Sequence, residues 1–228
     1  MALVAFCGTG AMAREEAVIA VAVVIPGIAD MRIKAEAGDT DAQFDLGCRY
    51  ETGDAVAADP AEAVSWYRKA AEQGNPDAQH NLGLMYASGE GVAKDLSEAV
   101  KWWCKSARQG CVAAQNELGL MYASGVGASK DPTEAVNWFR KAAEQGSTDA
   151  QINLGMMYAY GEGVAKDEVE ALAWFKISST SGEELALKNR EILERRLDEQ
   201  ALRAAQKRSA ELLKRIAANR SRLGAGMG

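Results

Sequence analysis

The residues that could carry chemistry in this 228-residue chain are few and scattered. His80 is the single histidine, and its neighbours Gln79 and Asn81 are poor metal ligands. Cysteine ligands for zinc usually come as C-x-x-C pairs, and no such spacing occurs among Cys7, Cys48, Cys104 and Cys111. We therefore predict no metal site, no cofactor and no catalytic residue.

Paired glycines could instead form phosphate-binding loops of the G-x-G type. The pairs are Gly89-Glu90-Gly91, Gly125-Val126-Gly127 and Gly161-Glu162-Gly163, with Gly53-Asp54-Ala55 at the matching place earlier in the chain. A phosphate loop follows a strand, whereas each of these pairs follows a helical pattern and recurs at a fixed interval. The glycines therefore predict turns between helices.

The interval is 36 residues, and it also governs an A-Q-x-x-L-G-x-x-Y pattern that occurs four times without an insertion. The copies begin at Ala42, Ala78, Ala114 and Ala150. The alanine, leucine and tyrosine of each copy lie at i, i+4 and i+8, which is helical spacing. A unit of this length cannot bury its apolar face alone and needs neighbours on both sides. The sequence therefore predicts an all-α solenoid of stacked helix-turn-helix repeats.

A second helix follows in each repeat, and it begins with an aspartate and a glutamate three residues later. The four starts are Asp59…Glu62, Asp95…Glu98, Asp131…Glu134 and Asp167…Glu170. We expect capping boxes, in which the aspartate accepts from the first turn and the glutamate bonds back to the aspartate N–H.

Glycine also lies in the middle of each first helix, where it costs about 1 kcal/mol relative to alanine. These glycines are Gly47, Gly83, Gly119 and Gly155. Close contact between the two helices of a repeat is expected to offset the cost. The expected residues on the other side of this contact are small: Ala63, Ala99, Ala135 and Ala171.

Four features together resemble the Sel-one-like repeat (SLR) branch of the tetratricopeptide-like superfamily. They are A-Q-x-x-L-G-x-x-Y, the G-x-G turn, D-x-x-E-A and the helix end W-[FYW]-x-K-[AS]-A-x-Q-G, which span residues 42–182. The resemblance implies a right-handed α-solenoid that binds proteins or peptides. We divide the chain into a degenerate half-repeat at 31–41 and four repeats at 42–77, 78–113, 114–149 and 150–185.

Helical geometry separates two sides on the first helix of each repeat. Signature residues such as Leu82 and Gly83 fall on one side and are expected to pack. In the tetratricopeptide-like family the opposite side lines a concave groove, so the resemblance implies a partner-binding groove of Phe44, Cys48, His80, Leu84, Asn116, Leu120, Ile152 and Met156. Four of these residues recur at the same place in each repeat and form an apolar row: Cys48, Leu84, Leu120 and Met156. If this row is exposed, it indicates an interaction surface. Alternatively, the superhelix or the C-terminal helices bury this row.

The function that we predict is a non-catalytic scaffold or adaptor that docks a peptide or protein segment in this groove. Two alternatives stay open. Some SLR proteins are associated with β-lactam binding or hydrolysis, which implies an envelope hydrolase or penicillin-binding-like protein, although no S-x-x-K motif occurs in the chain. In the other alternative the apolar row mediates self-assembly, and we expect a monomer or a weak dimer.

The N-terminal segment, residues 1–30, holds an apolar run from Ala17 to Ile25. It is either a signal peptide or anchor, or an apolar capping helix. An export signal has a net positive start, whereas Arg14 is followed by two glutamates. A cytoplasmic location is therefore slightly favoured, and export applies if residues 1–29 are a signal peptide.

The C-terminal part is basic, whereas the repeats are acidic. Residues 1–182 hold 15 Lys and Arg against 25 Asp and Glu, and residues 183–228 hold 11 against 7. An acidic solenoid argues against nucleic-acid binding. We predict a helical cap at residues 183–223 and a flexible tail at residues 224–228. The last helix is expected to pack through an apolar stripe of Leu202, Ala205, Ser209, Leu212, Leu213 and Ile216. Its basic residues make a weakly bound anionic partner the alternative to a simple cap.

Overall fold

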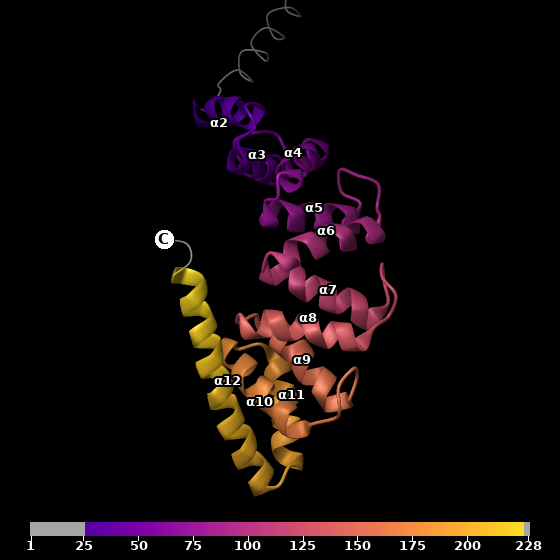
Figure 1. Ribbon diagram of the computed structural model, residues 1–228, viewed down its shortest axis with the longest axis vertical. Helices are drawn as coiled ribbons and strands as arrows, with labels where there is room; N and C mark the ends of the chain where they lie inside the picture. The colour runs from indigo at the N-terminus through magenta and orange to yellow at the C-terminus, as the bar shows by residue number, and fades with distance from the viewer. Residues whose placement is uncertain (1–25, 226–228) are drawn as a thin grey trace, which may run out of the picture.

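The computed structural model describes residues 26–225, and every regular element in that range is a helix (Figure 1). The elements are α2 (Pro26–Glu36), α3 (Thr40–Thr52), α4 (Pro60–Glu72), α5 (Pro76–Ser88), α6 (Leu96–Arg108), α7 (Val112–Ser124), α8 (Pro132–Glu144), α9 (Thr148–Tyr160), α10 (Glu168–Ser178), a 3-10 turn (Ser179–Ser181), α11 (Glu184–Arg196) and α12 (Glu199–Ala225). The apolar run from Ala17 to Ile25 lies outside the described residues. Of the described helices, none has both the length and the apolar character that a membrane crossing requires.

Consecutive helices pair and stack into a solenoid (Figure 1). We call α3, α5, α7 and α9 the A helices, and α4, α6, α8 and α10 the B helices. Each A helix packs against the B helix that follows it and against the helix that precedes it. The signature leucines Leu46, Leu82, Leu118 and Leu154 lie at the centre of this packing and have 0% exposed surface. The predicted all-α solenoid is confirmed.

Each B helix begins at the predicted aspartate, but the capping box is only half formed. Asp131 Oδ1, for example, accepts hydrogen bonds from the N–H groups of Thr133 and Glu134. The predicted glutamate half is wrong, because the N–H of each cap aspartate donates to the carbonyl oxygen of the signature tyrosine in the preceding A helix. These pairs are Asp59–Tyr50, Asp95–Tyr86, Asp131–Tyr122 and Asp167–Tyr158. The aspartate therefore starts the B helix and also fastens it to its A helix.

The mid-helix glycines pack against aromatic rings and not against the small residues that we expected. A Cβ atom built on Gly83 would lie 2.4 Å from Nε1 of Trp103. The other pairs are Gly47–Tyr67, Gly119–Phe139 and Gly155–Phe175. Burying a large apolar side chain contributes about 1.5–3 kcal/mol, which exceeds the helix cost of glycine at about 1 kcal/mol. The expectation that alanines such as Ala99 fill this place is corrected, because the missing Cβ makes room for a ring.

The buried glutamines of the A-Q pattern connect successive repeats. Gln79 is 4% exposed, and its Nε2 donates to the carbonyl oxygen of Ala71 at 2.9 Å. Its Oε1 accepts from Nε2 of Gln109, 30 residues later, at 2.8 Å. The same two bonds recur for Gln43 and Gln115. A buried polar side chain is costly unless it is hydrogen-bonded, so these bonds explain why the core tolerates glutamine.

Single helices at both ends of the array occupy the positions of further repeats. A side chain on one B helix bonds to the residue 18 positions later on the next A helix, and this offset also holds for α2 and α11. The pairs are Arg32–Tyr50, Arg68–Tyr86, Arg140–Tyr158 and Lys176–Glu194. Helix α2 thus takes the B position before the first repeat, although it begins at Pro26 and not at residue 31. Helix α11 takes the A position after the fourth repeat.

Helix α11 ends the stack because it has only one packing side. Ala186 and Leu193 are buried, as are Ala150 and Met157 one period earlier. Where the A helices have the glycine that accepts a ring, α11 has Glu191, whose side chain is 63% exposed. A carboxylate side chain at this place would block a further B helix.

Helix α12 leaves the stacking pattern and runs along α10 and α8 (Figure 1). Its predicted stripe is mostly confirmed, since Ala205, Ser209, Leu212 and Ile216 are buried. Leu213 is wrong, because its side chain is 48% exposed. Helix α12 packs on α8 and α10 through one side only. Leu213 lies 100° around the helix axis from the buried Leu212, and its side chain therefore falls outside this contact.

The fourth B helix is adapted to receive α12. Ala173 and Ile177 occupy places where the third repeat has Asn137 and Lys141. The two apolar residues belong with Leu212 and Ile216 of α12 to one buried cluster. Two ion pairs flank this cluster: Arg208–Glu170 at 2.7 Å and Arg215–Glu144 at 2.8 Å.

The glycine pairs form turns, as predicted. Gly89 ends α5 with a φ of 83°, which favours glycine. Gly91 has a φ of 68°, and a Cβ atom built on it would lie 2.1 Å from the carbonyl oxygen of Pro60 in the preceding repeat. This glycine therefore allows the turn and also the close approach of two repeats.

Candidate interaction surface

Leu84 and Leu120 occupy equivalent places on the A helices of the second and third repeats, and both are open to solvent. Their side chains are 40% and 37% exposed. Leu82 and Leu118, two residues earlier, have 0% exposed surface. The two sides of the A helix therefore differ as helical geometry requires, and neither α11 nor α12 covers these two exposed leucines.

The other apolar members of the predicted groove are less accessible. Phe44 is half-buried against the ring of Tyr67, with 5.9 Å between the ring centroids. Cys48 and Met156 are half-buried, and Cys48 is a free thiol. Ile152 is only 5% exposed, because it belongs to the cluster that joins α10 to the C-terminal helices. The apolar side chains of this side are therefore accessible in the second and third repeats, at Leu84 and Leu120, whereas Ile152 of the fourth repeat is covered.

The polar members of the predicted groove make local contacts. Nδ1 of His80 lies 3.3 Å from Oδ1 of Asn81. Burial lowers the pKa of His80 below its ordinary value, against the opposing effects of Asn81 and Asp77. The imidazole is therefore mostly neutral at pH 7. Oδ1 of Asn116 accepts from Nδ2 of Asn153 at 3.3 Å, which joins the A helices of the third and fourth repeats.

Two exposed apolar residues on this side of the array are not part of the groove that we predicted from the sequence. Ile192 of α11 is 53% exposed and lies one 36-residue period after Met156. Tyr160, at the end of α9, is 70% exposed and stands where the second and third repeats have serine. The period continued beyond residue 185 would have revealed Ile192. We define the A-helix row as Leu84, Leu120, Met156 and Ile192.

The sequence profile of the Sel1 repeat matches residues 40–75, 76–111, 112–147 and 148–183. The chain belongs to the Sel1-repeat family. The matched units begin two residues before the repeats that we set from the sequence. Proteins of this family are generally scaffolds for protein–protein interaction, and they have the helical solenoid described above.

Two solved structures are similar over most of this Sel1-repeat chain. One is c5321, a protective antigen of uropathogenic Escherichia coli strains with an SLR fold, at 38% identity and a TM-score of 0.78. The other is a Sel1 repeat protein from Oxalobacter formigenes, at 35% identity and a TM-score of 0.67. The matches cover 87% and 72% of this chain but 43% and 48% of those proteins, so the chain spans less than half the length of either. A search of curated proteins found no match.

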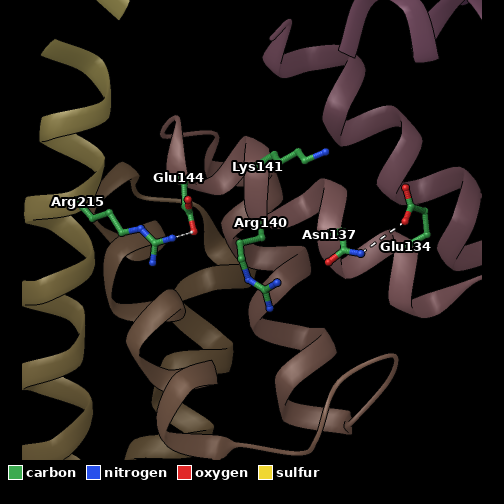
Figure 2. A pocket seen from close by; sticks show the side chains of 6 residues that line it. All are labelled: Glu134, Asn137, Arg140, Lys141, Glu144 and Arg215. Carbon is green, nitrogen blue, oxygen red and sulfur yellow. Dashed lines mark hydrogen bonds and ion pairs between the residues drawn. The ribbon is translucent and has the colours of Figure 1, made fainter. Parts of the chain in front are cut away.

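A hollow on the B-helix side of the Sel1-repeat array lies between α8 and α12 (Figure 2). Its charged and polar side chains already have partners. The pairs are Glu144–Arg215, Glu134–Asn137 and Arg140–Tyr158, and Lys141 lies over the ring of Trp138. Because each of these groups has a partner within the chain, and Arg215 of α12 pairs with Glu144 of α8, we assign the hollow to the attachment of α12. Among residues 26–225, no three His, Cys, Asp or Glu side chains gather as a metal site would require.

Proposed function

We propose that this Sel1-repeat chain is a non-catalytic scaffold that binds a peptide or protein segment on the concave side of its A helices. The observation that carries the proposal is the exposure of Leu84 and Leu120, at 40% and 37%, on neighbouring repeats. Fully burying a leucine side chain contributes about 1.5–3 kcal/mol, so a partner that covers both leucines gains substantially. Apolar side chains that are exposed next to one another on a protein surface mark interaction sites.

The absence of catalysis is part of the proposal. The single histidine is mostly neutral and faces an asparagine, which does not orient it as a general base. An envelope hydrolase or penicillin-binding-like protein would form a covalent bond between a serine and a β-lactam. We expect no labelled band after incubation of the purified protein with a fluorescent penicillin, and a labelled serine would overturn this part.

The binding surface is tested with a Leu84→Asp/Leu120→Asp double variant. The tagged wild type and the variant are each crosslinked in the native cell, and the captured proteins are compared. We expect the variant to lose the specific partner, because an apolar anchor at the centre of an interface contributes about 2 kcal/mol or more.

The matched control is Val126→Asp/Leu213→Asp, which changes two exposed apolar side chains away from the A-helix row. This control should capture the same partner as the wild type. If the A-helix variant captures the same proteins as the wild type, the proposed surface is wrong. Sedimentation at several concentrations tests self-assembly, which would appear as a mass that rises with concentration.

A further inference from the structure

Charge is distributed unequally between the two sets of helices. The A helices α5, α7 and α9 contain no lysine or arginine, and their only charged residues are Asp77, Glu117 and Asp149. The B helices of the same repeats carry most of the cations, at Lys101, Lys105, Arg108, Arg140, Lys141 and Lys176. A partner that lies along the A helices therefore meets an anionic and apolar surface.

A pocket on the A-helix side concentrates this charge. It lies between α7 and the start of α9 and has a volume of about 390 Å³. Its lining includes the carboxylates of Glu117 and Asp149 but no lysine, arginine or histidine. Among the described residues, neither carboxylate forms an ion pair with a basic side chain, whereas the half-buried Glu144, Glu170 and Glu194 each do.

Arg220 of α12 reaches this lining, but it donates to the carbonyl oxygens of Gln145 and Gly146. The side chain of Glu117 is half-buried, and burial raises the pKa of its carboxyl group. The neighbouring charge of Asp149 raises the pKa of Glu117 further. Both causes disfavour the ionised form, whereas a cation placed in the pocket would favour it.

The pocket adjoins the A-helix row at Leu120. Asn116 and Glu117 precede Leu120 by four and three residues on α7, so the three side chains lie on one side of the helix within about one turn. One short segment of a partner can therefore cover Leu120 and reach Glu117 at the same time.

We propose that the partner segment is cationic: large apolar side chains cover Leu84 and Leu120, and a lysine or arginine enters the pocket beside Glu117 and Asp149. This inference rests on the proposed function for the choice of surface. Charge complementarity of this kind speeds association and excludes acidic competitors. The basic side chain would offset the repulsion between the two carboxylates, neither of which has an ion-pair partner among residues 26–225.

A peptide selection identifies the partner chemistry without knowledge of the natural partner. A phage library of random peptides is selected on the full-length protein and counter-selected on the Leu84→Asp/Leu120→Asp variant. We expect enriched peptides with a net positive charge, in which Lys or Arg lies within a few residues of Leu, Ile or Phe. Neutral or acidic enriched peptides would overturn the cationic inference and leave the proposed function standing. Failure to enrich any peptide over the variant would instead contradict the proposed function.

Affinity measurements then test the pocket. The best selected peptide is labelled, and its binding is followed by fluorescence anisotropy at low and high salt. Glu117→Gln/Asp149→Asn should weaken binding roughly three- to fivefold and reduce its salt dependence, since a partly exposed ion pair has an effect of that size. The control Glu90→Gln/Glu162→Gln removes two exposed carboxylates from the turns and should bind as the wild type does. Equal loss in both variants, or no loss in either, would overturn the assignment of the pocket.

Discussion

The ring of Phe139 fills the space that a side chain at Gly119 would need. A Cβ atom built on Gly119 would lie 2.4 Å from both Cδ1 and Cε1 of that ring. Carbon atoms do not approach so closely in a packed interior, and Phe139 is only 1% exposed, so the ring has little room to move. The glycine therefore sets the distance between α7 and α8.

Gly119→Ala should destabilise the protein by about 1–3 kcal/mol through overpacking, despite the better helix propensity of alanine. The free energy of unfolding is measured in urea. Gly27→Ala is the control, because no atom of the described residues lies within 4 Å of its built Cβ, and it should be neutral or slightly stabilising. A stable Gly119→Ala variant would show that the ring moves aside without cost.

Leu84→Asp/Leu120→Asp should leave the free energy of unfolding within about 0.5 kcal/mol of the wild type for each change, because both side chains are substantially exposed. Leu82→Ala and Leu118→Ala, at buried positions, should each cost about 2–5 kcal/mol. Thermal and urea unfolding check both. If the double variant unfolds as readily as the buried ones, the two leucines belong to the core.

Leu212→Ala should cost about 2–5 kcal/mol, whereas Leu213→Ala should stay within about 0.5 kcal/mol. The two leucines are adjacent on α12, but Leu212 is 1% exposed and packs in the cluster with α8 and α10, whereas Leu213 is 48% exposed. Calorimetric melting distinguishes them. Equal effects of the two changes would mean that α12 is not held in the described position.

Acidification should destabilise the wild type more than a His80→Asn variant. Burial lowers the pKa of His80 below the ordinary value of 6.5, so the unfolded chain binds the proton more readily than the folded chain. The contribution of His80 is therefore fully retained above pH 6.5 and is lost as the pH falls through the lowered pKa.

Melting temperatures of both proteins at about pH 7 and about pH 5 check this expectation. The comparison with the variant is needed because Glu117 acts in the opposite direction. Its pKa is raised above 4.5, so its contribution is full below that pH and is lost as the pH rises. An identical pH dependence in the two proteins would show that His80 is not desolvated.

The sequence alone determined the repeat, the helix pairs and most helix starts. These features depend on contacts within one or two repeats, so the 36-residue period records them directly. The aspartate at each B-helix start and the glycine after each A helix are local signals that act through adjacent backbone groups. The exposed leucines Leu84 and Leu120 also followed from the spacing of apolar residues on one helix.

Only the tertiary structure decided what covers each apolar side. Leu120 and Ile152 both lie on the unpacked side of an A helix in the sequence, but one is 37% exposed and the other 5%. The difference arises from the C-terminal helices, which contact residues far away in the sequence. Asn219 of α12, for example, donates to the carbonyl oxygen of Glu144, 75 positions earlier. Helical periodicity shows which side of a helix is apolar, whereas the identity of the covering element depends on contacts between distant segments, and a local pattern does not contain them.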